Sequence, residues 1–95
     1  MLIQKPLTRN DVVTLKLLTG EEVIAEYDSE DEHVVKVSKP SVVAANGEGM
    51  GLIPWVMSSM PKLISINKKT IIAYMPTDEA IAKKFTSLTS SIARV

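Results

Sequence analysis

The chain has 95 residues and contains no cysteine, a single histidine and no hydrophobic run of membrane-spanning length. Without cysteine, neither a disulfide scaffold nor a thiolate metal site can form. The opening residues lack the apolar core of a signal peptide, so we expect an intracellular, cytoplasmic protein. Because no serine lies in a nucleophile-elbow context and His33 has no thiol partner, we expect no catalytic residues, no cofactor and no metal.

The net charge is zero, but the two signs are segregated along the chain. Residues 1–35 hold eight of the eleven acidic residues and three of the eleven basic ones, and the remainder reverses this ratio. A fold that keeps the two parts separate would have an acidic surface and a basic surface. A neutral total therefore does not exclude an anionic ligand.

The first half of the chain has the alternating pattern of β-strands. Apolar and polar residues alternate over 12–18, and a turn at Gly20 leads into a second predicted strand over 22–28. The acidic run 28–32 predicts an exposed turn. A cation site is the weaker interpretation, because the run lacks the glycine and the ligand spacing of an EF-hand loop.

The middle of the chain predicts a second hairpin. Residues 33–45 form the third predicted strand, and Pro40 within it predicts a bulge or a sheet edge, since proline lacks a ladder donor. The glycines of 46–49 indicate a hairpin tip leading to a strand over 50–57. They do not form a phosphate-binding loop, because no helix and no Lys-Ser/Thr pair follow them. Trp55 can stack on a ring ligand, although burial is the favoured interpretation.

The last part of the chain predicts a third hairpin and then a helix. Strands over 62–67 and 70–75 flank a short polar turn, and the second of them is apolar on both faces, which is typical of a strand covered on both sides. Four apolar residues then follow at helical spacing, with Thr77 as the expected N-cap. These residues are Ile81, Phe85, Leu88 and Ile92.

Five to six short strands, tight turns and one helix predict a single, mainly β domain over 1–95. We expect a small, strongly bent antiparallel barrel of the SH3-like type over about 10–76. A C-terminal α-helix over about 77–93 would follow it, packing on its own barrel or on a neighbour.

Two segments of the sequence resemble the motifs of Sm-like proteins, the superfamily that includes LSm proteins and Hfq. The first motif is similar to 13–37, with alternating apolar residues, a glycine and an aspartate-containing turn. It matches through Val13, Leu15, Leu17, Gly20, Val23, Ala25 and an aspartate at 28 or 31. The second is similar to 63–74, with Asn67-Lys68 in its polar turn. The chain lacks the usual first helix and has a long middle segment, in which it resembles small phage-encoded members.

This resemblance implies a cyclic homo-oligomeric ring of about five to seven copies, closed by pairing of edge strands. The interface residues implied are Ile71, Ile72, Ala73 and Tyr74. It also implies that uridine- or adenine-rich single-stranded RNA binds at the central pore. The residues that correspond to this site are His33, Asn67, Lys68 and Lys69.

Two functional interpretations follow from these observations. The first is a non-enzymatic RNA-binding ring, in the host cytoplasm if the chain is phage-encoded. The second is a protein-interaction or assembly module that has the same ring or barrel and binds no RNA. Its contact surface would contain Trp55, Met57, Met60 and the C-terminal helix. The acidic residues of 28–32 weigh against RNA, because they precede the turn that contains His33.

Overall fold

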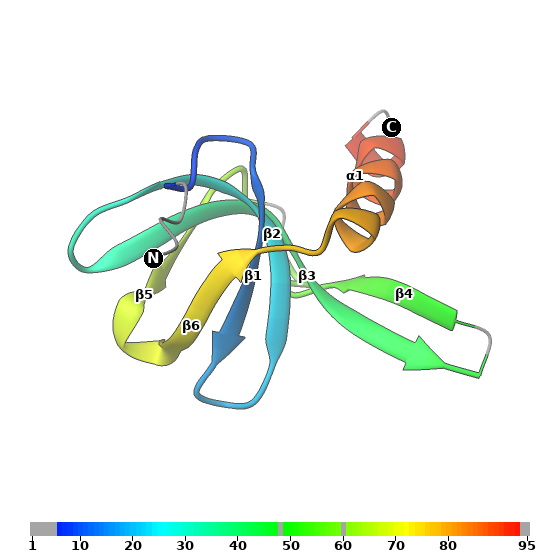
Figure 1. The fold of residues 1–95 in the computed structure, drawn as a ribbon, viewed down its shortest axis with the longest axis horizontal. Helices are drawn as coiled ribbons and strands as arrows, with labels where there is room; N and C mark the ends of the chain where they lie inside the picture. Colours follow the sequence, from blue (N-terminus) through cyan, green and yellow to red (C-terminus); the bar gives the residue numbers. More distant parts are fainter. Residues whose placement is uncertain (1–5, 48, 60, 94–95) are drawn as a thin grey trace, which may run out of the picture.

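The structure is a computed structural model that describes residues 6–47, 49–59 and 61–93, excepting the side chains at 45, 46, 50 and 90–93. One antiparallel sheet and one C-terminal helix make up the fold, which confirms the mainly β prediction (Figure 1). The elements are β1 (Val12–Leu17), β2 (Glu22–Glu30), β3 (Val34–Asn46), β4 (Gly49–Pro54), β5 (Ile64–Asn67), the 3-10 helix η1 (Lys68–Thr70), β6 (Ile71–Pro76) and α1 (Glu79–Ala93).

The strands are ordered β4-β3-β2-β1-β6, and β5 also pairs with β3. The long strand β3 uses its first half, Val34 to Val37, to pair with β5 and its second half, Ser41 to Asn46, to pair with β4. Among the described residues, β5 pairs only with β3 and β6 only with β1. The sheet is therefore curved but not closed, and the expected barrel closure stays a prediction.

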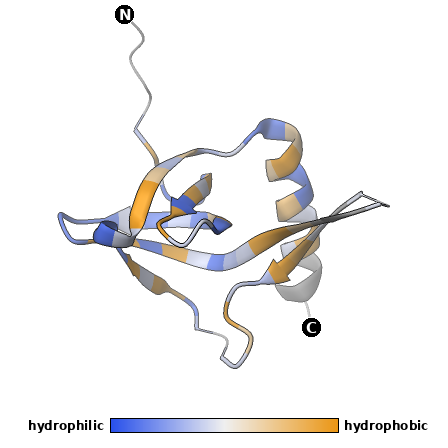
Figure 2. Ribbon diagram, turned by 90° about the horizontal axis from the view of Figure 1, so that it is seen from below, coloured by the Kyte–Doolittle hydropathy of each residue, from blue (hydrophilic) through white to orange (hydrophobic). Residues whose placement is uncertain are grey.

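The core lies on one face of the sheet, mainly on β1, β2 and the first half of β3. Because side chains alternate along a strand, every second residue of β1 points to this face, and its partners on β2 do the same. Figure 2 shows these hydrophobic positions along the strands, with hydrophilic residues at the far end of the β2–β3 hairpin. The buried set is Val13, Leu15, Leu17, Val23, Ala25, Tyr27, Val35, Val37 and Ile66.

The predicted irregularity at Pro40 is a β-bulge. Ile24 pairs with Ser41 and Glu26 pairs with Ser38, so two residues of β3 lie opposite one residue of β2. Lys39 takes a φ of 54° there, and the carbonyl of Pro40 accepts the N–H of Trp55 at 2.9 Å. Beyond this bulge, Ser41 and Val42 still pair with β2, and the rest of β3 projects with β4 as a hairpin (Figure 1).

The acidic run does not form the long exposed turn that the sequence predicts. Strand β2 continues to Glu30, and only 31–33 turn. The reason is that these carboxylates have partners: Asp28 lies 3.2 Å from the guanidinium of Arg9, and Glu30 accepts three hydrogen bonds that are described below. A paired carboxylate tolerates partial burial that an unpaired one does not.

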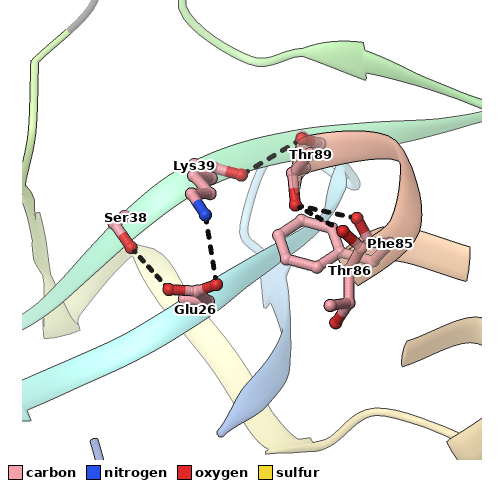
Figure 3. A network of polar contacts seen from close by, with 7 residues as sticks. Glu26, Ser38, Lys39, Phe85, Thr86 and Thr89 are labelled. Atoms are coloured by element: carbon pink, nitrogen blue, oxygen red, sulfur yellow. Dashed lines mark hydrogen bonds and ion pairs between the residues drawn. The ribbon is translucent and has the colours of Figure 1, made fainter. Parts of the chain in front are cut away.

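The helix packs against the sheet through a different set of residues from the one predicted. Phe85 is fully buried and points toward β2 and β3 (Figure 3), but Leu88 is 40% exposed. Thr89 is buried instead, and its hydroxyl donates to the carbonyl of Phe85 at 2.8 Å. The contacting row therefore runs at intervals of four through Ile81, Phe85 and Thr89. The side chain of Ile92 lies outside the described residues.

The N-cap of this helix is Asp78 and not Thr77. The carboxylate of Asp78 accepts the N–H groups of Ala80 and Ile81 at 3.2 and 3.4 Å, which satisfies two free donors of the first turn. The hydroxyl of Thr77 is instead 2.8 Å from that of Thr14, which joins the start of the helix to β1. Both residues precede the helix, but only the side chain of Asp78 reaches its backbone.

Candidate functional site

The two turns that correspond to the expected RNA site lie side by side in the fold. Because β3 and β5 are antiparallel neighbours, Val34 pairs with Asn67, and the N–H of Lys68 donates to the carbonyl of His33 at 2.8 Å. His33, Asn67, Lys68 and Lys69 therefore gather at one end of the sheet, away from α1 and the projecting hairpin (Figure 1). Two segments separated by more than thirty residues in the sequence form one surface.

Asn67 orders the second turn. Its side-chain oxygen accepts the N–H of Lys69 at 2.9 Å, and its carbonyl accepts the hydroxyl of Thr70 at 2.7 Å. Short polar side chains stabilise turns in this way because they replace a missing backbone partner. The side-chain carbonyl of Asn67 is thus engaged in shaping η1.

Asp31 has the same role in the first turn. Its carboxylate accepts the N–H groups of His33 and Val34 at 2.7 and 3.0 Å, and these backbone hydrogen bonds lower the pKa of Asp31. The imidazole of His33 lies 3.2 Å from the carboxylate of Glu32, with both side chains largely exposed. An exposed pair of this kind holds its geometry weakly. The His33 ring is therefore accessible to a ligand.

Lys68 belongs to a hydrogen-bonded set of four side chains that we call the Glu30 network: Glu30, Lys68, Tyr27 and Tyr74. The ammonium of Lys68 lies 2.7 Å from Oε2 of Glu30, and the hydroxyl of Tyr74 donates to the same oxygen at 2.7 Å. The hydroxyl of Tyr27 donates to Oε1 at 2.8 Å. One carboxylate thus joins β2, η1 and β6, and it fixes the base of the second turn.

The pKa shifts within the Glu30 network reflect this shared carboxylate. Partial burial acts to raise the pKa of Glu30, but the hydrogen bonds from Lys68, Tyr74 and Tyr27 outweigh it and hold that pKa below 4.5. The hydrogen bond to Glu30 raises the pKa of Lys68. Burial, followed by the hydrogen bond to Glu30, raises the pKa of Tyr27 to about 12. Glu30 and Lys68 are therefore both charged at neutral pH and largely balance each other.

Lys69 is the second lysine of the turn, and it differs from Lys68. Lys69 is exposed, and it forms no ion pair within the part of the chain that the structure describes. Glu30, Asp31 and Glu32 surround the same end of the sheet, so the surface of one chain is not strongly basic. The tyrosine hydroxyls were not predicted as part of the site, because Tyr74 and Glu30 are 44 positions apart and no local spacing connects them.

The four residues expected at an oligomer interface divide into two groups. Ile71 and Tyr74 pack against the core of their own chain. Ile72 is 62% exposed and lies where the β1–β6 register shifts, and Ala73 beside it is half-buried. Ile72 is thus the most exposed large hydrophobic residue of β6.

Within 6–47, 49–59 and 61–93, no three acidic or histidine side chains are grouped closely enough to hold a metal ion. No helix in these ranges is long and apolar enough to cross a membrane. A search against protein-family models finds no match for the chain, and a search of curated proteins likewise finds none.

Proposed function

We propose that this chain is an Sm-like subunit that assembles into a closed ring and binds single-stranded RNA, without enzymatic activity. One observation carries the proposal: His33, Asn67, Lys68 and Lys69 converge at one end of a sheet whose outer strands have unpaired edges. The two parts of the proposal, assembly and RNA binding, rest on different features and are argued separately.

Ring assembly is supported by the edges of β5 and β6. Each strand has a row of N–H and C=O groups with no partner strand among the described residues, and such edges pair readily with another chain. Pairing the β5 edge of one copy with the β6 edge of the next repeats one heterologous contact, which closes when the rotation permits. A ring of about five to seven subunits would complete the barrel-like sheet across subunits.

RNA binding is supported by the accessible groups at the two turns. In a ring, every copy of Lys69 and of the His33 ring would surround one axis, which concentrates positive charge and stacking surfaces where a single strand can pass. Lys68 would then hold the shape of the turn through Glu30, and Lys69 would attract phosphate. This role for Lys68 differs from the expectation that Lys68 itself contacts RNA.

The test is fluorescence anisotropy of labelled oligouridine and oligoadenine at two salt concentrations. Binding should weaken as salt rises, and Lys69→Ala should lower both the affinity and the slope of log affinity against log salt. Lys84→Ala, which removes an exposed lysine of α1, is the matched control and should change neither. If Lys69→Ala leaves affinity and slope intact, RNA binding at this turn is wrong.

The Glu30 network favours a second candidate function, an assembly module that binds no RNA. Glu30 balances Lys68, and Asp31 and Glu32 add negative charge beside His33. The contact surface of this module would include Met57, which is 79% exposed, whereas Met60 lies outside the described residues. A ring that purifies without nucleic acid, judged by its absorbance ratio at 260 and 280 nm, and binds neither oligonucleotide would support this candidate.

A further inference from the structure

The carboxylate beside Lys68 is fixed from the protein side. Both oxygens of Glu30 accept a tyrosine hydroxyl: Tyr27 donates to Oε1 at 2.8 Å and Tyr74 donates to Oε2 at 2.7 Å. Tyr27 is buried and Tyr74 is half-buried, so these hydroxyls have little freedom to follow a moving carboxylate. Rotation of the Glu30 side chain would break both hydrogen bonds, and the carboxylate therefore stays 2.7 Å from the ammonium of Lys68.

The ion pair between Lys68 and Glu30 is better shielded from water than its neighbour at the same end of the sheet. The side chains of Lys68 and Glu30 are 29% and 28% exposed, whereas those of His33 and Glu32 are 79% and 85% exposed. Opposite charges attract more strongly where water is partly excluded, and salt screens them less. The positive charge of Lys68 is therefore largely cancelled at physiological salt.

This cancellation acts against an anionic ligand at one of the two lysines in the turn. A phosphate that approaches Lys68 also approaches the negative charge of Glu30, so attraction and repulsion nearly balance. Lys69 is exposed and forms no ion pair in the described part of the chain, so its attraction for phosphate is not opposed in this way. The two adjacent lysines thus differ in what they offer to RNA.

We propose that Glu30 restrains RNA binding by neutralising Lys68, so that each second turn offers the free charge of Lys69 alone. The inference rests on the proposed RNA-binding ring and adds what limits its affinity. Glu30 does not itself contact RNA and acts through Lys68, as a positioning residue. In a ring the effect is repeated around the axis, because every copy has its own pair.

The test is the salt dependence of RNA affinity for Glu30→Gln, which keeps the size of the side chain and removes its charge. Anisotropy of labelled oligouridine and oligoadenine should show a slope of log affinity against log salt more negative by about 0.7 for each phosphate that Lys68 gains, or about fourfold tighter binding at about 0.15 M salt. If Glu30 only shaped the turn, the same variant would bind more weakly, and its slope would not steepen.

Two controls separate the release of Lys68 from a general loss of acidic charge. Glu32→Gln removes the same charge at the same end of the sheet, but Glu32 pairs with His33, so this variant should gain less affinity than Glu30→Gln. Glu30→Gln combined with Lys68→Ala should return to the wild-type affinity, because the freed charge is gone. Circular dichroism checks the folding of each variant, and Glu30→Met, of similar length and without charge, replaces Glu30→Gln if that variant does not fold.

The possible results distinguish this inference from the proposed function. Unchanged or weaker binding by folded Glu30→Gln, an equal gain from Glu32→Gln, or a gain that survives Lys68→Ala overturns the inference and leaves RNA binding intact. If neither the wild type nor Glu30→Gln binds an oligonucleotide, both are overturned. Binding by Glu30→Gln alone, lost again with Lys68→Ala, would show that the restraint is complete.

Discussion

The inner strands β1 and β2 differ from the outer strands β5 and β6 in how far one chain completes them. Strands β1 and β2 are paired on both sides and bury side chains such as Leu15 and Val23 completely. Strands β5 and β6 are paired on one side only among the described residues, and β6 leaves Ile72 62% exposed. A single chain thus pairs the inner strands on both sides, whereas each outer strand keeps one edge without a partner strand among the described residues.

The largest expected effect is the loss of stability when a core residue of an inner strand is replaced, and an outer-strand residue serves for comparison. Leu15→Ala should lower the free energy of unfolding by about 2–5 kcal/mol, since it leaves a cavity in the core. Ile72→Ala should act mainly on assembly, so its effect should depend on protein concentration through mass action. Urea unfolding at two protein concentrations measures both. A loss from Ile72→Ala as large as that from Leu15→Ala at every concentration would place β6 in the core of the single chain.

A smaller effect is expected where the two kinds of strand are joined, at Glu30. Glu30→Gln should lower the free energy of unfolding by about 1–3 kcal/mol, because hydrogen bonds to a charged acceptor are lost. The pKa of Glu30 is lowered in the folded state, so its contribution is present above pH 4.5 and is lost as pH falls through that lowered pKa.

Acid titration of the unfolding midpoint measures this contribution. The wild type should lose stability more steeply than Glu30→Gln as the pH falls below 4.5. Glu32→Gln is the matched control, because Glu32 is 85% exposed and should leave the midpoint unchanged. Equal acid profiles for the wild type and Glu30→Gln would mean that the carboxylate does not join β2 to β6.

The smallest expected effect is a change in how the stability of the fold falls at high pH. The pKa of Tyr27 is raised from 10.0 to about 12, so the protonated phenol favours the folded state below pH 10, and this contribution is lost as pH rises through about 12. The pKa values of Tyr74 and Lys68 are raised as well and act in the same direction. Tyr27→Phe should therefore flatten, without abolishing, the alkaline loss of stability, measured by far-ultraviolet circular dichroism. An unchanged profile would show that Tyr27 ionises without effect on folding.

Local pattern predicted much of the fold, because strand alternation and turn residues act over short distances. The hairpins at Gly20 and at 46–49 and the bulge at Pro40 follow from such features. The face of α1 was predicted less well. Apolar spacing of three and four residues favoured Leu88, but the sheet contacts Thr89, and the helix orientation that decides this depends on tertiary packing.

The candidate site was predictable as a location but not as a set of contacts. The resemblance to Sm-like proteins pointed to the turns at His33 and Lys68, and the antiparallel pairing of β3 and β5 does bring them together. The balance of Lys68 by Glu30 was not predictable, because the acidic run 28–32 predicts an exposed turn and not a carboxylate with partners. Its hydrogen bonds come from side chains that are distant in sequence and reach it only after the strands have paired.

The proposed ring depends on pairing between the open edges of β5 and β6 in neighbouring copies of the chain. The most direct test is multi-angle light scattering of the wild-type protein on a sizing column at micromolar concentration. If the ring forms, the column should show one species with a mass about five to seven times that of the 10.4 kDa chain. A single species of 10.4 kDa would contradict it.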